Sequence, residues 1–119
     1  DNTATATQII TIQDTTNPVF DAAPAAITVE CIDDVPAMTN LGWTDNCDGA
    51  GSVTGSDSAL SGDTCGGTIT RTWSYTDACD NTATATQIIT IQDTTNPVFD
   101  AAPAAITVEC IDDVPAMTN

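Results

Sequence analysis

The chain contains no lysine and no histidine, and Arg71 is its only cationic side chain. Against this single positive charge stand 17 acidic residues, which give a formal net charge of −16. A surface of this kind repels nucleic acid and anionic membranes, so we expect neither as a partner. Without histidine or lysine, the commonest general base and the Schiff-base nucleophile are both missing. We therefore expect no enzymatic activity, although a carboxylate pair of the glycosidase type stays open as an alternative.

Aromatic residues are also scarce, at 4% of the chain, and no apolar run is long enough to span a bilayer. No stretch has a helical period. Instead, Val, Ile and Thr alternate with small residues between prolines and glycines, which is typical of short strands. We predict strands over residues 26–31, 41–45, 52–60, 68–76 and 82–92. Strands of this length, separated by turns, predict an all-β protein with a β-sandwich fold.

The sequence repeats itself. Residues 1–40 are identical to residues 80–119 at a constant offset of 79 (80 − 1 = 79). A perfect repeat of this period indicates small domains in a linear tandem array within a longer chain. We predict that residues 1–13 are the C-terminal hairpin strand of a preceding repeat. Residues 14–92 are then a complete unit with its N-terminal linker, and residues 93–119 are the linker and first strand of the next repeat.

The strand predicted over residues 68–76 shows its two faces by a period of two. Ile69, Trp73 and Tyr75 share one side, and Arg71 has the same parity. We therefore expect the only cation to lie partly beneath the core, where it needs a carboxylate, and Glu30 is the expected partner. An arginine whose head group reaches water is the alternative.

Cysteine offers a way to stabilise so small a unit. The complete unit holds Cys31, Cys47, Cys65 and Cys79, while Cys110 repeats Cys31. An even number, without a C-x-x-C motif or histidine, indicates two disulfides rather than a zinc site. Disulfides imply an oxidising, extracellular location.

Strand direction restricts how these cysteines pair. Successive strands alternate in direction, so Cys31 and Cys65 fall at one end of the sandwich and Cys47 and Cys79 at the other. The Cα atoms of a disulfide lie within roughly 7 Å of each other, whereas a strand of about nine residues spans about 30 Å. We therefore predict the pairs Cys31–Cys65 and Cys47–Cys79, each stabilising the fold by ~2–4 kcal/mol.

Two acidic loops resemble each other, TDNCDG at residues 44–49 and TDACDN at residues 76–81. The same end of the sandwich receives the linker QDTTNP. The aspartates expected to converge there are Asp14, Asp45, Asp48, Asp77 and Asp80. Clusters of carboxylate and amide oxygens fit Ca²⁺, which takes about 6–8 oxygen ligands. The alternative is that Asp and Asn are present simply as good turn residues, and the spacing does not match an EF-hand.

The succession ITVEC, TDNCDG, CGGTITRTW, TDACDNTATATQ and ITIQDTTNPVF resembles the hyalin-repeat-like (HYR-like) immunoglobulin-type domains. These domains occur in large surface and secreted proteins of Bacteroidetes, including gliding-type adhesins. The resemblance covers the whole unit and implies an immunoglobulin-like β-sandwich, extracellular tandem arrays, and an adhesive or structural role. Asp80 stands where the family usually has glycine, which alters the turn and adds a potential ligand.

The same resemblance brings in a bacterial O-glycosylation pattern, in which Asp precedes Ser or Thr and then a small residue, an aliphatic residue or Thr. It matches Thr15, Ser58 and Thr94. A motif this short also recurs by chance in a threonine-rich chain.

Together these features predict a rod-like or fibre segment of a cell-surface protein, stapled by disulfides and stiffened by Ca²⁺. Its expected partners are the neighbouring identical repeats, with lateral self-association into a filament as a further expectation. Two alternatives remain open. One is an adhesin module that recognises a glycan or a protein, and the other is a fibre subunit assembled by strand exchange between chains.

Overall fold

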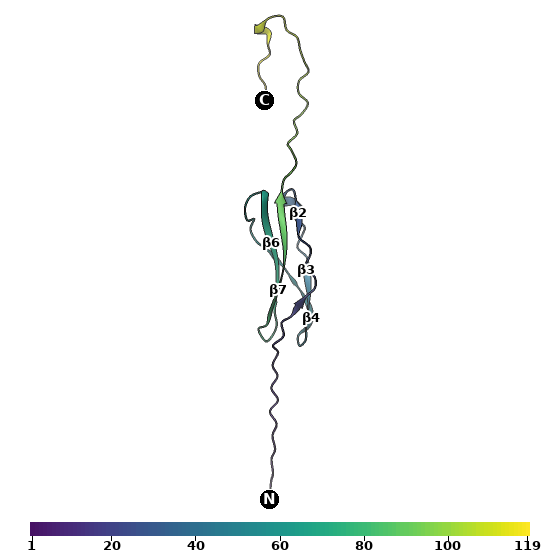
Figure 1. Ribbon diagram of the computed structural model, residues 1–119, viewed down its shortest axis with the longest axis vertical. Helices are drawn as coiled ribbons and strands as arrows, with labels where there is room; N and C mark the ends of the chain where they lie inside the picture. The colour runs from purple at the N-terminus through teal and green to yellow at the C-terminus, as the bar shows by residue number, and fades with distance from the viewer.

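A computed structural model describes all 119 residues, and it consists of a folded β unit with an extended arm at each end (Figure 1). The molecule measures 131 × 19 × 18 Å along its principal axes. Residues 1–13 form no strand and approach the unit from one end, while residues 93–119 leave from the opposite end. The long dimension therefore comes from the two arms.

The folded unit contains two sheets. In spatial order, the first sheet holds β1 (Val19–Phe20), β3 (Asn40–Asp45) and β4 (Gly49–Thr54). The second holds β2 (Ile27–Val29), β7 (Thr82–Gln92), β6 (Cys65–Thr76) and β5 (Ser56–Asp57). All pairings are antiparallel except that of β2 with β7, which is parallel. Two short 3₁₀ turns, η1 (Ile32–Asp34) and η2 (Ile111–Asp113), complete the structure. The predicted immunoglobulin-like β-sandwich class is confirmed.

Most predicted strands are confirmed, but one predicted strand is in fact two. The stretch predicted as a single strand over residues 52–60 is divided at Gly55 into β4 of one sheet and β5 of the other. A Cβ atom at Gly55 would lie 2.9 Å from Trp73 Nε1 and 3.0 Å from Met38 Sδ. Glycine therefore lets the chain pass close to the core as it changes sheets. The short strand β1 was not predicted, because it lies inside the proline-bounded linker.

Strand direction defines two poles of the unit. β3 and β6 both end at the N-terminal pole, where the chain enters and where loops 46–48 and 77–81 lie. β2 and β7 both run to the C-terminal pole, which carries η1 and the start of β6. The alternation of strand direction expected from the sequence is confirmed, so loops far apart in the sequence meet at each pole.

The core lies between β6 and the strands around it. Ile69 of β6 stands opposite Ile89 of β7, and Ile89 and Ile91 are completely buried, as is Trp73. The expected inward face of β6 is therefore confirmed. Ile10 and Ile12 are the copies of Ile89 and Ile91, yet they are 73% and 89% exposed. The same sequence is buried only where β6 and β2 flank it.

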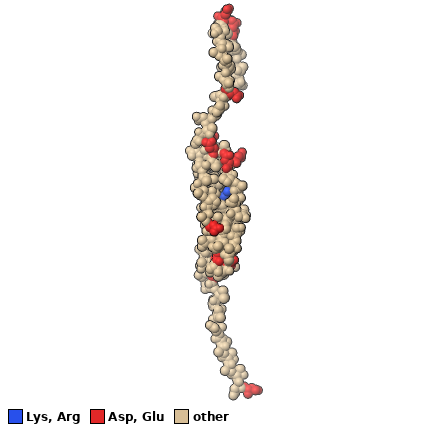
Figure 2. Space-filling view, turned by 90° about the vertical axis from the view of Figure 1, so that its right-hand side faces the viewer, with Lys and Arg blue, Asp and Glu red and all other residues tan.

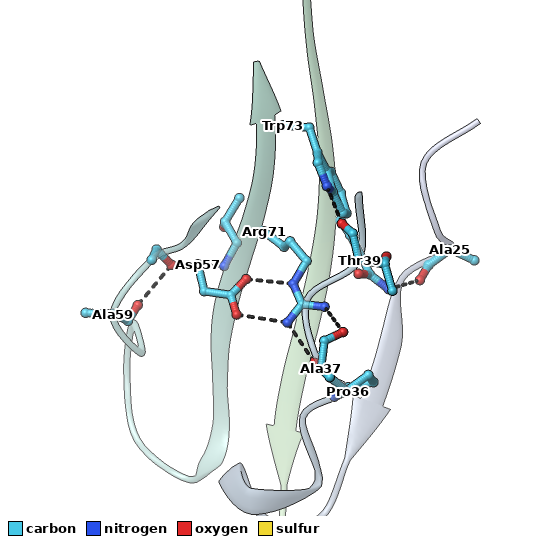
Figure 3. A network of polar contacts seen from close by, with 11 residues as sticks. Ala25, Pro36, Ala37, Thr39, Asp57, Ala59, Arg71 and Trp73 are labelled. Carbon is cyan, nitrogen blue, oxygen red and sulfur yellow. Dashed lines mark hydrogen bonds and ion pairs between the residues drawn. The ribbon is translucent and has the colours of Figure 1, made fainter. Parts of the chain in front are cut away.

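Arg71 lies inside the sandwich, at 4% exposure, and its partner is Asp57 rather than the expected Glu30 (Figure 3). Its Nε donates to Asp57 Oδ1 at 2.7 Å, and Nη2 donates to Asp57 Oδ2 at 2.9 Å. The guanidinium also donates to the carbonyl oxygens of Pro36 and Ala37 at 2.8 and 3.3 Å. The expectation of Glu30 was wrong because Glu30 directly follows β2 and lies at the C-terminal pole. The alternative of a head group in water is wrong as well.

Candidate metal centre at the N-terminal pole

Three carboxylates converge at the N-terminal pole. Asp14, Asp45 and Asp77 each offer an oxygen, and these oxygens lie within 4.8 Å of one another. Asp45 ends β3 and Asp77 follows β6, so each of the two sheets contributes one member. Asp14 comes from the linker. Asp14 and Asp77 are only 9% and 5% exposed. The site therefore joins the two layers of the sandwich to the incoming chain.

Backbone hydrogen bonds hold the two loop aspartates in place. Asp45 Oδ2 accepts the amides of Cys47 and Asp48 at 2.8 and 2.9 Å. Asp77 Oδ1 accepts the amides of Cys79 and Asn81, both at 2.8 Å. These are turns in which an aspartate side chain binds backbone amides a few residues further on. The two aspartates thus fix the conformation of their own loops, and both stay within the cluster of three carboxylates.

Two asparagines attach the linker. Asn46 Nδ2 donates to Asp14 Oδ1 at 3.3 Å, and Asn81 Nδ2 donates to the Asp14 carbonyl oxygen at 3.1 Å. Asn81 Nδ2 also donates to Asp77 Oδ2 at 2.9 Å. Neither asparagine was among the predicted site residues. Their position inside the two similar acidic loops was the available signal.

The electrostatics of the pole favour a cation. Burial opposes ionisation of Asp77, but hydrogen bonds from Asn81 and Cys79 outweigh it and lower the pKa of Asp77. Asp45 Oδ1 is buried without a hydrogen-bond partner, which is costly for a charged oxygen. The only cationic side chain, Arg71, is engaged by Asp57. Carboxylate oxygens are ligands of the type that Ca²⁺ takes, so the residues present are chemically compatible with such an ion.

The other two aspartates predicted for this site lie beside it. Asp48 Oδ2 accepts the Tyr75 hydroxyl and the Ala78 amide, both at 3.0 Å. Asp80 is exposed and has a φ of 66°, the only positive φ outside glycine. A left-handed conformation favours glycine, so aspartate at this position carries some backbone strain. The structure therefore groups three of the five predicted ligands and places two around them.

An aromatic pair, Trp43 and Tyr75, precedes two of the carboxylates along β3 and β6. Trp43 and Tyr75 stack with ring centroids 3.7 Å apart and an interplanar angle of 13°. Trp43 precedes Asp45 by two residues on β3, and Tyr75 precedes Asp77 by two residues on β6. The period of two along β3 therefore puts Trp43 on the same face as Asp45, while Asp77 directly follows the end of β6.

The cysteines are exposed thiols in this structure. Cys47 and Cys79 lie in the two loops of the N-terminal pole, and Cys31 and Cys65 lie at the C-terminal pole. The pKa of Cys47 is raised, first by desolvation and then by nearby Asp14. Members of each predicted pair share a pole, and the disulfides themselves stay a prediction.

The three hydroxyls that match the O-glycosylation pattern have different surroundings. Thr15 is exposed. Ser58 Oγ donates to the Ala59 carbonyl at 3.0 Å and accepts the Thr70 amide at 2.9 Å. The Thr94 hydroxyl donates to Glu30 Oε1 at 2.6 Å.

Fold and site together define an immunoglobulin-like β-sandwich module with an acidic pole that receives its own linker. The sequence profile of the family described as HYR-like domain with 4 cysteines matches residues 19–91, and the chain belongs to this family. The matched residues contain four cysteines, Cys31, Cys47, Cys65 and Cys79.

Searches of curated proteins and of solved structures gave no match. HYR-like domains are typical of extracellular and cell-surface proteins, and they indicate a repeat or adhesion-type module. The structure contains no helix with the length and apolar character needed to cross a bilayer.

Proposed function

We propose that this chain is a segment of a long bacterial cell-surface protein, in which identical units form a rod or fibre stiffened by Ca²⁺ at its junctions. One observation carries the proposal: Asp14 belongs to the linker, yet it lies within 4.8 Å of Asp45 and Asp77 of the unit. A cation held by these three carboxylates restrains the linker against both sheets. The junction then becomes a fixed joint instead of a flexible tether.

Asp14, Asp45 and Asp77 would hold the ion, which supplies positive charge and oxygen coordination where the chain has no cation of its own. Asp48 and Asp80 add negative charge in the same two loops. We place the disulfides Cys31–Cys65 at the C-terminal pole and Cys47–Cys79 at the N-terminal pole. The second bridge would join the β3–β4 loop of one sheet to the β6–β7 turn of the other.

A rod segment is favoured over a ligand-binding adhesin module because the two tryptophans belong to the core. Trp73 is completely buried, with its indole N–H donating to the Thr39 carbonyl at 2.9 Å, and Trp43 is 8% exposed. Aromatic side chains that bind a glycan or a protein need to be accessible. Thr15, Ser58 and Thr94 are all exposed and stay the candidate O-glycosylation sites of this proposal.

Terbium, which replaces Ca²⁺, tests the site directly, because Trp43 and Tyr75 lie close enough to sensitise its luminescence. We expect the chain to bind Tb³⁺ and Ca²⁺ competitively, and EDTA to lower its melting temperature. Asp14→Asn should weaken binding by about tenfold or more, because it removes one ligand charge.

Asp93→Asn is the matched control, since Asp93 occupies the same sequence in the C-terminal arm, away from Asp45 and Asp77. It should leave the affinity unchanged. Equal effects of the two substitutions, or a melting temperature that does not respond to EDTA, would refute the calcium-stiffened rod.

A further inference from the structure

The linker sequence DTTNP occurs twice, at residues 14–18 and 93–97, and the two copies make different contacts. Both begin with the same local turn. Asp14 Oδ1 accepts the Thr16 amide at 3.0 Å, and Asp93 Oδ1 accepts the Thr95 amide at 2.9 Å. The difference between the copies therefore lies in which neighbouring unit is present, and not in the conformation of the turn.

The first copy is bound by the unit that follows it. Asp14 and Pro18 are buried against the N-terminal pole, and Asn46 and Asn81 donate to Asp14. Thr15 and Thr16 remain exposed. The following unit thus uses the aspartate and the proline of the linker and leaves both threonine hydroxyls unused.

The second copy is bound by the unit that precedes it. The hydroxyls of Thr94 and Thr95 donate to the two carboxylate oxygens of Glu30, at 2.6 and 2.5 Å. The Asp93 amide donates to the Thr64 carbonyl at 3.3 Å. Glu30 directly follows β2, so these bonds dock the linker on the C-terminal pole. The preceding unit thus uses the two threonines that the following unit leaves free.

From these complementary contacts we propose that each DTTNP linker is a two-sided clasp, held by the glutamate of the unit before it and by the acidic pole of the unit after it. The partner that fits the C-terminal pole is therefore the N-terminal pole of a second copy of the unit. The inference rests on the proposed tandem rod and specifies its joint. The following unit binds the aspartate of the linker, and the preceding unit binds the threonine next to it. These two residues are adjacent in the chain, so their Cα atoms are only about 3.8 Å apart.

Such short spacing brings two acidic poles together. The C-terminal pole carries Glu30, Asp33, Asp34 and Asp63, and the N-terminal pole carries the aspartates described above. Red acidic side chains gather near both ends of the folded unit (Figure 2). Like charges at this separation repel each other, and the repulsion is screened by salt. The clasp therefore holds together surfaces that would separate without it, and a cation at the joint assists it.

The C-terminal half of the clasp is testable in the 119-residue chain. In Thr94→Val/Thr95→Val, the side chains keep their shape and lose their hydroxyls. Backbone ¹⁵N order parameters at residues 94 and 95 should fall from about 0.8 to below about 0.6. Thr15→Val/Thr16→Val changes the identical dipeptide in the N-terminal arm and should leave residues 94 and 95 unchanged. Unchanged order parameters in Thr94→Val/Thr95→Val would overturn the docking.

Adding residues 41–92 after Asn119 completes a second unit and tests both halves together by small-angle X-ray scattering in saturating Ca²⁺. We expect one narrow distribution of end-to-end distance, and a broader, shorter distribution in Thr94→Val/Thr95→Val. The Thr15→Val/Thr16→Val control should match the parent. If the clasp variant matches the parent too, the clasp is wrong.

The same chain separates this inference from the calcium proposal. If EDTA has no effect but the threonine variant broadens the distribution, the calcium site fails and the clasp stands. If only EDTA broadens it, the clasp fails and the calcium site stands. A glycan on Thr94 in the native protein would also overturn the clasp at that linker, because a glycosylated oxygen has no hydrogen to donate to Glu30.

Discussion

The position of Arg71 determines where the unit has positive charge. It is the only cation in the chain, and it is buried between β5 and the segment 36–39, which connects the two sheets (Figure 3). Arg71 therefore stabilises the interior of the sandwich, and the acidic poles have no cationic side chain of their own. The cation proposed for the N-terminal pole would therefore have no competing cationic side chain in the unit.

Asp57→Asn should destabilise the unit by about 1–3 kcal/mol, because it leaves a buried guanidinium with a weaker partner. Hydrogen bonding to Arg71 lowers the pKa of Asp57 below its ordinary value of 3.8. The ion pair therefore contributes its full stability above pH 3.8 and loses it as the pH falls through the lower pKa of the folded state.

Urea unfolding at pH 7 and pH 3 checks this, and Asp100→Asn serves as a control that removes one charge from the exposed C-terminal arm. The destabilisation by Asp57→Asn should shrink at pH 3. If the free energy of unfolding instead falls by the same amount at both pH values in Asp57→Asn, that result would contradict the assignment of Asp57 as the ionised partner.

The positions and partners of individual residues were not equally predictable from the sequence. Asp45 and Asp77 were predictable at one pole because strand direction alone delivers them there. Asp48 was also predicted at that pole and lies there, but its bonds to Tyr75 and Ala78 depend on turn geometry that strand counting does not contain. Asp57 was missed as the partner of Arg71, because the predicted strand over residues 52–60 ignored the change of sheet at Gly55.

Among the elements, the linker and the end of β2 form a pH-sensitive pair. Hydrogen bonds from Thr94 and then Thr95 lower the pKa of Glu30 from its ordinary value of 4.5. The pairing is therefore fully present above pH 4.5 and is lost as the pH falls through the lower pKa of the docked state. Asp93, Asp33, Asp34 and the Cys31 thiol are the other titratable groups near this pair.

The mobility of residues 94 and 95 should therefore rise as the pH is lowered from 6 to 3, because protonated Glu30 accepts these hydroxyl bonds less strongly. Amide chemical shifts and ¹⁵N relaxation of the 119-residue chain report it. Glu30→Gln should remove the transition, while Glu109→Gln, in the identical sequence of the C-terminal arm, should preserve it. A transition that persists unchanged in Glu30→Gln would assign it to the neighbouring aspartates instead.

The two copies of TATATQIITIQ show why element prediction from sequence has a physical limit. At residues 82–92 this sequence is the central strand β7, and at residues 3–13 it is an exposed arm. Its alternation correctly predicts a strand with one apolar face. Whether that face is buried depends on β6 and β2, which are distant in sequence. The short strand β1 has the same dependence, because only pairing with β3 makes it a strand.

At the scale of the whole molecule, the proposed function depends on the two poles more than on the sheets. The sheets bury a small core, whereas the poles collect the carboxylates, the cysteines and both linkers. Charge of one sign at both poles opposes end-to-end contact between units. In the proposed array, covalent continuity, the clasp and a cation would act against this repulsion, and the relative orientation of neighbouring units would depend on their balance.

The predicted disulfides would strengthen both poles, and identical repeats supply a control for them. Cys31→Ser removes the bridge expected with Cys65, and its melting temperature should fall by about 10 °C or more, since each bridge is worth about 2–4 kcal/mol. Cys110→Ser alters the same sequence in the C-terminal arm and should leave the melting temperature unchanged.

Peptide mapping tests the pairing itself. Because the chain has no lysine, peptides for non-reducing mass spectrometry are best made by cleavage beside aspartate. Cross-linked peptides containing Cys31–Cys65 and Cys47–Cys79 are expected, and a Cys47–Cys65 peptide would contradict the pairing, because these two cysteines lie at opposite poles.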